Sequence, residues 1–188
     1  SATATTGAAV VLGQVDGAHY SPNRDFHQVS AASLNAPSDV AFDGTRLVVA
    51  DAGNQRVLIW NALPSVDGAP ADLVLGQASF TENKPNRGHI DADQDGDFDA
   101  SADSLFYPAG LAIDGDTLYI ADTFNHRVLA FRPFPTQSGA PATKVLGQAD
   151  FEANDPNRGL GWFVRSGVDG RLRRWRRWRR GRRRRSTF

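Results

Sequence analysis

The stretch ADAGNQRVLIW at residues 50–60 decides the fold, because it returns as ADTFNHRVLAF at residues 121–131. Working outward from it, residues 34–88 align with residues 105–159 at a constant offset of 71, with 28 identities in 55 positions. Self-similarity of this length indicates two copies of one structural unit.

Each copy predicts four short strands with turn signals between them. An Asp-Gly pair follows the first strand, β-branched and aromatic residues fill the second and third, and Asp-x-x-Asn marks the turn between those two. No segment of the two copies has the length and 3.6-residue periodicity of a good helix. The pattern is typical of the four-stranded sheets of a β-propeller. The predicted strands span residues 39–42, 46–50, 56–60 and 73–75 in the first copy and 110–113, 117–121, 127–131 and 144–146 in the second.

A third, partial copy lies at the N-terminus, where VLGQ (residues 11–14) and PNR (residues 22–24) match the next copy at an offset of 63. It predicts one extra N-terminal strand before the two complete units. The resulting divisions are an N-terminal strand and loop (1–33), a first unit (34–88), an acidic insertion (89–104), a second unit (105–159) and an Arg/Trp-rich tail (160–188).

The shared motif, P-x-[DG]-[VL]-A-[FI]-D-G followed by L-x-[VI]-A-D-x-x-N-x-R-V-L-x-[WF], resembles the NHL repeat. The VLGQ strand and the PNRG loop resemble a long-repeat variant of bacterial proteins. The resemblance implies an all-β propeller, typically of six blades around a central channel. Members of that family include partner-binding modules, RNA-binding modules and a lyase of amidated-peptide processing, so the fold leaves the function open.

Two blades and a spare strand leave open sheet faces and unpaired edges. Three explanations remain. The chain is a piece of a longer propeller, or it self-assembles so that three copies supply six blades, or it persists as an open arc. We favour the first.

Asp51, Asn54 and Arg56 recur as Asp122, Asn125 and Arg127. An Asp at a strand end accepts backbone N–H bonds, Asn tolerates the left-handed conformation, and Arg pairs with the Asp. The trio could also line one face of the propeller as a polar site. We expect a scaffold role, because a site used once need not appear in every repeat.

The insertion contains DADQDGDFD, residues 91–99, which resembles the first half of a calcium loop. Oxygen ligands at alternate positions, with a glycine at the sharp turn, suit a hard cation. Ala102 stands where such a loop has a bidentate Glu, and Asp103 could replace it in a distorted loop. The alternative is a solvated acidic loop. We predict bound Ca²⁺ with the ligands Asp91, Asp93, Asp95, Asp97 and Asp99.

The formal net charge of zero conceals two opposite parts. Residues 1–164 carry 9 Lys and Arg against 20 Asp and Glu, whereas residues 165–188 carry 12 Arg against one Asp. The chain has no Cys, which excludes disulfides, thiolate metal sites and Cys nucleophiles. Its small, polar N-terminus is typical of a site left by signal-peptide removal, so we expect a secreted or periplasmic protein.

The tail interleaves Arg with Trp175 and Trp178. Such a sequence suits nucleic acid or an anionic membrane surface. It is also what GC-rich, Gly-coding DNA yields when translated out of frame, and we favour a frameshifted or truncated terminus because the repeat stops where the tail begins. In either case we expect residues 160–188 to be disordered or loosely helical unless they meet the acidic part of the chain.

We therefore predict a binding or scaffold module for an unknown protein or small ligand, with no catalytic residue assigned. The four histidines have no metal-ligand spacing, and His126 occupies a turn position that predicts exposure. A propeller-type lyase or hydrolase with a metal in the channel, and a nucleic-acid or membrane binder acting through the tail, are the alternatives.

Overall fold

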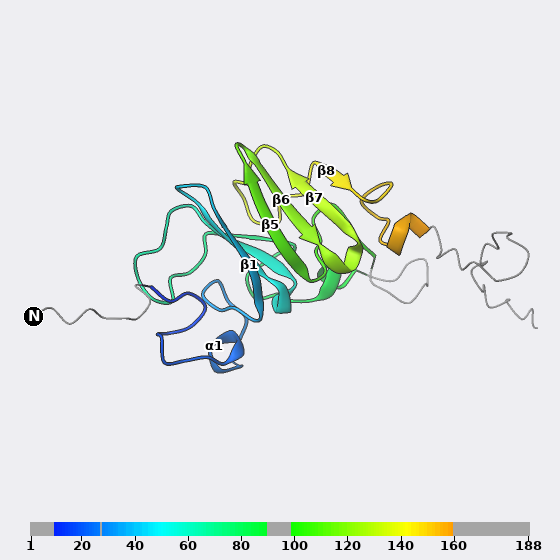
Figure 1. Cartoon of the computed structure of the whole chain (residues 1–188). Coiled ribbons are helices and arrows are strands. Elements are labelled where there is room, and N and C mark those ends of the chain that lie inside the picture. Colours follow the sequence, from blue (N-terminus) through cyan, green and yellow to red (C-terminus); the bar gives the residue numbers. More distant parts are fainter. Residues whose placement is uncertain (1–9, 27, 90–98, 160–188) are drawn as a thin grey trace, which may run out of the picture. The chain divides into compact units, whose positions relative to one another are not determined.

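The computed structural model describes residues 10–26, 28–89 and 99–159. Eight strands form two antiparallel sheets of four strands each, and the strands of each sheet are adjacent in chain order. Each copy of the repeat makes one sheet (Figure 1), so the predicted all-β fold is confirmed.

The strands agree closely with the sequence prediction, and the third and fourth strands of both sheets match it residue for residue. Both first strands begin two residues earlier than predicted, because a β-bulge beside the initial proline keeps that residue paired. The first sheet comprises β1 (Pro37–Phe42), β2 (Leu47–Asp51), β3 (Arg56–Trp60) and β4 (Leu73–Leu75). The second comprises β5 (Pro108–Asp114), β6 (Thr117–Asp122), β7 (Arg127–Phe131) and β8 (Lys144–Leu146).

Short helical turns connect these strands. In both sheets a 3₁₀ turn joins the second strand to the third, and the PNRG motif forms another after the fourth strand. The turns are η1 (Ala52–Asn54), η2 (Pro85–Gly88), η3 (Thr123–Asn125) and η4 (Pro156–Gly159), and the related N-terminal segment forms α1 (Pro22–Phe26).

The prediction of an extra N-terminal strand is wrong, because residues 11–14 form none. β4 has the same VLGQ motif and is a strand because it pairs with β3. Among the described residues, no strand lies in the equivalent position beside Val11. A backbone segment needs such a neighbour to complete its hydrogen bonds as a strand.

The N-terminal VLGQ segment nevertheless occupies the place against the first sheet that β4 occupies against the second. The amide of Gly68 donates to the carbonyl of Val11 at 2.8 Å, and in the next repeat Gly139 donates to Val74 at 2.8 Å. A Cβ atom on Gly13 would lie 2.7 Å from the side chain of Leu34. The motif therefore keeps its packing position without its strand pairing.

The two faces of each sheet have different neighbours, because successive residues along a strand point to opposite faces. We call the face toward the preceding repeat the leading face and the face toward the following repeat the trailing face. The leading face of the first sheet carries Val49, Leu58, Trp60 and Val74, and its trailing face carries Val48, Ala50, Val57 and Ile59.

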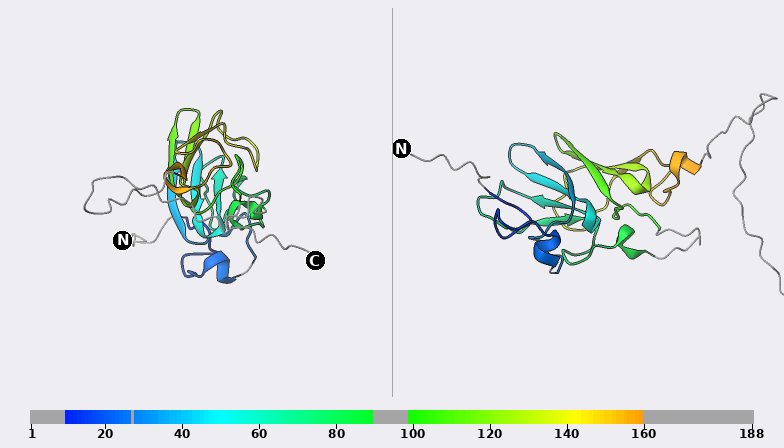
Figure 2. Two further views of the ribbon diagram at one scale, coloured as in Figure 1. Left: turned by 90° about the vertical axis from the view of Figure 1, so that its right-hand side faces the viewer. Right: turned by 60° about the horizontal axis from the view of Figure 1, so that its bottom comes forward.

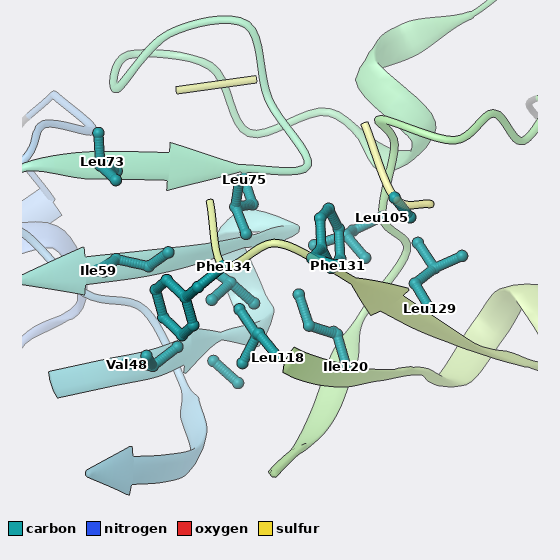
Figure 3. Close-up of a cluster of buried hydrophobic side chains, with 13 residues drawn as sticks. Val48, Ile59, Leu73, Leu75, Leu105, Leu118, Ile120, Leu129, Phe131 and Phe134 are labelled. Carbon is teal, nitrogen blue, oxygen red and sulfur yellow. The ribbon is translucent and has the colours of Figure 1, made fainter. Parts of the chain in front are cut away.

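The main core lies between the trailing face of the first sheet and the leading face of the second. It is a closed apolar layer in which the side chains from the two sheets interdigitate (Figure 3). Its largest members from the second sheet and its flanking loops are Leu105, Leu118, Ile120, Leu129, Phe131 and Phe134. Burial of this layer is the main stabilising contribution to the pairing of the two sheets.

Across the interface β5 contacts β1 and β2 of the first sheet. Figure 2 shows the two sheets beside each other. The Ser38 hydroxyl donates to the carbonyl of Pro108 at 2.8 Å, and the amide of Leu111 donates to Asp39 Oδ2 at 2.7 Å. Side chains of β1 thus bond directly to the backbone of β5. The two sheets pack face to face as consecutive repeats and do not share one continuous sheet.

Candidate functional site

The polar cluster of the first sheet is built around the carboxylate of Asp51, at the end of β2. Arg56 Nε donates to Asp51 Oδ2 at 2.7 Å, Asn54 Nδ2 donates to the same oxygen at 2.8 Å, and the amide of Asn35 donates to Oδ1 at 2.7 Å. All three side chains of the cluster are fully buried.

The guanidinium of Arg56 extends the cluster to three loop carbonyls. Nη1 donates to Phe80 at 2.6 Å, and Nη2 donates to Ser30 and Ser33 at 2.9 Å each. The arginine thus ties the strand end to the loop that precedes the first strand and to the loop that follows the fourth, which explains why the repeat carries a planar five-donor cation here.

The second sheet reproduces this arrangement around Asp122. Arg127 Nε donates to Asp122 Oδ2 at 2.7 Å, and Arg127 Nη2 donates to the carbonyls of Ser101 and Ser104 at 2.8 and 3.0 Å. Nη1 donates to the carbonyl of Phe151. The scaffold role predicted for the trio is confirmed, because the same contacts hold the same loops in both repeats.

Electrostatics agrees with a structural role. Burial raises the pKa of Asp51 above its ordinary value, although the charge of Arg56 opposes this shift. Burial likewise lowers the pKa of Arg56, and burial raises the pKa of Asp122. The desolvation of a buried ion pair offsets much of its Coulombic attraction. The pair is therefore best understood as a fixed cross-link between loops.

A reciprocal amide pair joins consecutive repeats near each polar cluster. Asn86 Nδ2 donates to Asn125 Oδ1 at 2.9 Å, and Asn125 Nδ2 donates back to Asn86 Oδ1 at 2.7 Å. The N-terminal repeat makes the same pair between Asn23 and Asn54, with distances of 3.2 and 2.8 Å. The Asn that recurs in the PNRG motif of each repeat is therefore also a scaffold residue.

Three aromatic side chains of the second repeat have no counterpart in the first. Phe106, Tyr107 and Phe124 stand where the first copy has Asn35, Ala36 and Gly53. The rings of Tyr107 and Phe124 stack with centroids 5.0 Å apart and an interplanar angle of 25°, and Phe106 meets Phe124 edge to face at 5.0 Å. The side chain of Phe124 is 50% exposed.

This aromatic cluster is held by backbone contacts. The amide of Phe124 donates to the carbonyl of Phe106 at 3.1 Å, and the amide of Tyr107 donates to Gln55 Oε1 at 2.7 Å. Tyr107 has a φ of 54°, in the left-handed region, as Ala36 does at 47°. A left-handed backbone at an aromatic residue is unusual.

Sequence reasoning missed the aromatic cluster, because it followed the identities between the two copies. The signal lay in the differences: three polar or small residues of the first copy are all replaced by aromatic residues in the second. Repeated residues report on the scaffold, whereas exposed unrepeated ones are candidates for function.

Most of the predicted calcium loop lies outside the described residues. This applies to Asp91, Asp93, Asp95 and Asp97, whereas Asp99 is described and is partly exposed. Asp103, considered above as a substitute ligand, forms an ion pair with Arg87 and accepts a hydrogen bond from the Ser101 hydroxyl at 2.6 Å. In the described part of the chain no group of three or more His, Cys, Asp or Glu residues is arranged to hold a metal.

None of the described histidines belongs to a group of potential metal ligands. His126 is exposed in its turn, as predicted, and His19 Nδ1 lies 2.7 Å from Asp16 Oδ1 on the surface. His27 lies outside the described residues.

An open pocket of about 690 Å³ lies where the hairpin after β1 meets the hairpin after β5. Arg46 at its edge pairs with Asp43 at 2.7 Å, and its guanidinium carbon lies 3.5 Å from the ring centroid of Phe134. This cation–π contact covers the outer side of the main core. Among the helices described, none has the length and apolar character needed to cross a membrane.

Comparison with known proteins agrees with the architecture. A 94-residue segment, 49% of this chain, is 35% identical to "NHL repeat-containing protein 2" of Gallus gallus. The segment covers 10% of that relative's length, so the chain corresponds to a small part of it. The model of the NHL repeat matches residues 107–131, which run from Tyr107 to the end of β7. The matched residues contain β5, β6 and β7, so three of the four strands of the second sheet lie in a segment that is similar to the NHL repeat.

Proposed function

We propose that the chain is a binding or scaffold module, that its two sheets are consecutive propeller blades, and that the aromatic cluster forms part of its contact surface. The observation that carries this proposal is the contrast between repeated and unrepeated residues. The repeated polar groups are buried and used in bonds between loops, whereas Phe106, Tyr107 and Phe124 occur once; Phe124 is 50% exposed, and Phe106 and Tyr107 are half-buried.

Aromatic side chains suit a contact surface because they offer a large, flat apolar area at a small cost in conformational entropy. Here the left-handed backbone at Tyr107 and the stacking on Phe124 restrict the rings further. Little ordering is then required on binding, so more of the contact energy appears as affinity. The partner in this proposal is a protein segment or small ligand that presents an apolar or planar group to the rings.

A peptide display library panned against the full chain tests this proposal. The matched variants are Tyr107→Ala and Phe124→Gly, which install the residues of the first repeat at the same positions. Both backbone conformations already accept those residues in the first sheet, so the variants should fold, with a loss of about 1 kcal/mol of unfolding free energy from the removed ring contacts. Selected peptides should bind the wild type and lose at least about tenfold in affinity on either variant. Peptides that bind all three proteins equally would refute the assignment of the surface.

Calcium binding by Asp91, Asp93, Asp95, Asp97 and Asp99 remains a proposal, supported by the oxygen-rich spacing of the sequence. Isothermal titration with CaCl₂ should give heat for the wild type and none for the Asp93→Ala/Asp95→Ala variant. Equal heats from both proteins would contradict it. Export to the periplasm or outside the cell is likewise a proposal, supported by the composition of the N-terminus.

A further inference from the structure

The open pocket between the hairpin after β1 and the hairpin after β5 is lined by polar groups that the scaffold does not use. Thr45 and Arg46 lie in the first hairpin, and Asn61 directly follows β3. Among the hydrogen bonds of the described residues, none involves the terminal NH₂ groups of Arg46, the side-chain amide of Asn61 or the hydroxyl of Thr45. These groups are therefore available to a ligand.

Arg46 is nevertheless held in a fixed place. Its Nε donates to Asp43 Oδ2 at 2.7 Å, and its guanidinium carbon lies 3.5 Å from the ring centroid of Phe134. The carboxylate of Asp43 is itself fixed, because the backbone amides of Thr45 and Arg46 donate to its Oδ1 at 2.9 and 2.7 Å. The side chain of Arg46 thus loses little freedom when its terminal NH₂ groups bind a ligand.

The main polar side chains of the pocket are not part of the repeated pattern. Arg46 and Asn61 correspond to Thr117 and Arg132 in the second copy. Thr117 is buried, so the second hairpin offers no group like the guanidinium of Arg46 at this position. The pocket therefore follows the same contrast as the aromatic cluster: recurring polar residues hold the fold, and accessible residues that occur once are candidates for binding.

The charges of the pocket favour a neutral ligand. Within the described part of the chain, its lining contains one cationic side chain, Arg46, and one anionic side chain, Asp43, and the two are paired. Hydrogen bonds from the backbone amides of Arg46 and Thr45 lower the pKa of Asp43, so its carboxylate is charged at neutral pH and balances the guanidinium. An anionic ligand would also meet the excess of Asp and Glu in residues 1–164, and a cationic ligand would meet Arg46.

We propose that this pocket binds a neutral sugar ring. The adjacent hydroxyls of a sugar both donate and accept hydrogen bonds. The lining provides both roles, because the NH₂ groups of Arg46 donate, whereas the amide of Asn61 and the hydroxyl of Thr45 donate and accept. Ile113 and Gly115 form a less polar part of the wall, against which the C–H face of the ring can pack.

The pocket is also of a suitable size. Its volume of about 690 Å³ lies within the range of sites for small molecules. An extended peptide is recognised along a sheet edge or a groove, by donors and acceptors in a row, whereas here the free polar groups line a single pocket between two hairpins. Because a sugar has few atoms and the pocket is open, we expect dissociation constants on the order of 1 mM.

Titration of the ¹⁵N-labelled full chain, followed by ¹H–¹⁵N correlation spectra, tests this inference. The probes are the methyl glycosides of glucose, galactose and mannose. At least one of them should cause saturable shifts in the signals of Thr45, Arg46, Asn61, Ile113 and Gly115, including the side-chain N–H signals of the arginine and the asparagine. Methyl glucuronide, inorganic phosphate and N-acetylalanine methylamide serve as an anionic sugar, a simple anion and a peptide unit, and they should shift these signals less at equal concentration.

Four variants locate the site. Arg46→Met should weaken binding of the glycoside at least about tenfold, and Asn61→Ala about threefold to tenfold, because each removes hydrogen bonds to the sugar. Arg132→Met removes another exposed arginine, which does not line the pocket, and should leave the affinity unchanged. Phe124→Gly should also leave it unchanged, because the aromatic cluster precedes β5 and follows β6, whereas the pocket lies at the hairpin between these strands.

Several outcomes would overturn the inference. None of the three glycosides shifting the pocket signals is one, and this result needs no variant to fold. Glycoside binding that survives both Arg46→Met and Asn61→Ala, or that is lost in Phe124→Gly, would place the sugar elsewhere. Tighter binding of the glucuronide or phosphate to the pocket signals would show an anion site, and tighter binding of the peptide unit would show a peptide site. The inference does not depend on the aromatic cluster, whose peptide binding is measured separately.

Discussion

Removing the buried guanidinium of Arg56 is predicted to be among the most destabilising changes in the first sheet. Arg56→Met deletes the partner of Asp51 and the donors to the carbonyls of Ser30, Ser33 and Phe80. Breaking a fully buried ion pair costs about 3–5 kcal/mol, so we expect a loss of about 4 kcal/mol. For a chain of this length that corresponds to a decrease in Tm of about 8–16 °C.

The pH dependence of the variant gives an independent check. In the wild type, burial raises the pKa of Asp51 and the charge of Arg56 partly opposes that rise. Without Arg56, the pKa of Asp51 therefore rises further. The native state then binds a proton that the unfolded state releases, so stability falls as pH rises from the unfolded pKa through the raised native pKa. The deficit of Arg56→Met should therefore shrink as pH is lowered from about 7 toward about 4.

Urea unfolding followed by far-UV circular dichroism measures both effects, with two matched variants. Arg46→Met breaks a partly exposed pair and should cost about 1 kcal/mol or less. The double variant Asp51→Asn/Arg56→Met removes both charges. Its loss of unfolding free energy should be smaller than the sum of the losses caused by Asp51→Asn alone and Arg56→Met alone. Strict additivity in this cycle, or a loss at Arg56 as small as at Arg46, would refute the reasoning.

Three further predictions concern glycine packing, the interface between the sheets and the tail. Gly76→Ala should lose about 2–4 kcal/mol of unfolding free energy, because φ is 83° and the new Cβ would lie 2.5 Å from a carbon of Leu105. Gly44→Ala has a φ of 97° but open space around it, so it should lose about 1–2 kcal/mol. Equal losses from the two variants would contradict the packing argument. Phe134→Ala should cost about 3–5 kcal/mol and the equivalent Leu63→Ala less than about 0.5, as urea midpoints will show. Fluorescence anisotropy with single-stranded DNA should detect binding that weakens steeply with salt and disappears when residues 172–188 are deleted; salt-independent binding would contradict an electrostatic contact.

The strands could be predicted from the sequence because the two copies supply the same local signals. β3, β4, β7 and β8 match the prediction at both ends, since turn residues bound each of them. The bulge at Pro37 could not be anticipated, because a bulge depends on the register with the neighbouring strand and not on local sequence.

The N-terminal VLGQ segment shows the limit of argument by similarity. Residues 11–14 carry the motif of β4, yet β4 owes its strand geometry to hydrogen bonds with β3. The shared motif places Gly13 beside Leu34, as it places Gly76 beside Leu105. It does not supply a neighbouring strand with which residues 11–14 could pair. Strand formation depends on the partner as well as on the motif.

The polar cluster and the aromatic cluster differ in how far the sequence could reveal them. The Asp51–Arg56 pair followed from repetition and charge. The stacking of Tyr107 on Phe124 did not, because it depends on a left-handed turn that brings residues 17 positions apart together. Aromatic residues at positions that differ between repeats were the available clue.

The asparagine pairs explain how one connection can change its length. Asn23 and Asn54 are 31 residues apart, whereas Asn86 and Asn125 are 39 apart, yet both pairs close in the same reciprocal geometry. The connection that contains Asn86 and leads to the second sheet is thus eight residues longer than the one that leads to the first, and the asparagine pair still forms. New loops, including an engineered epitope or a sensor peptide, should be accepted between Gly88 and Ser101, where the longer connection already carries these eight extra residues.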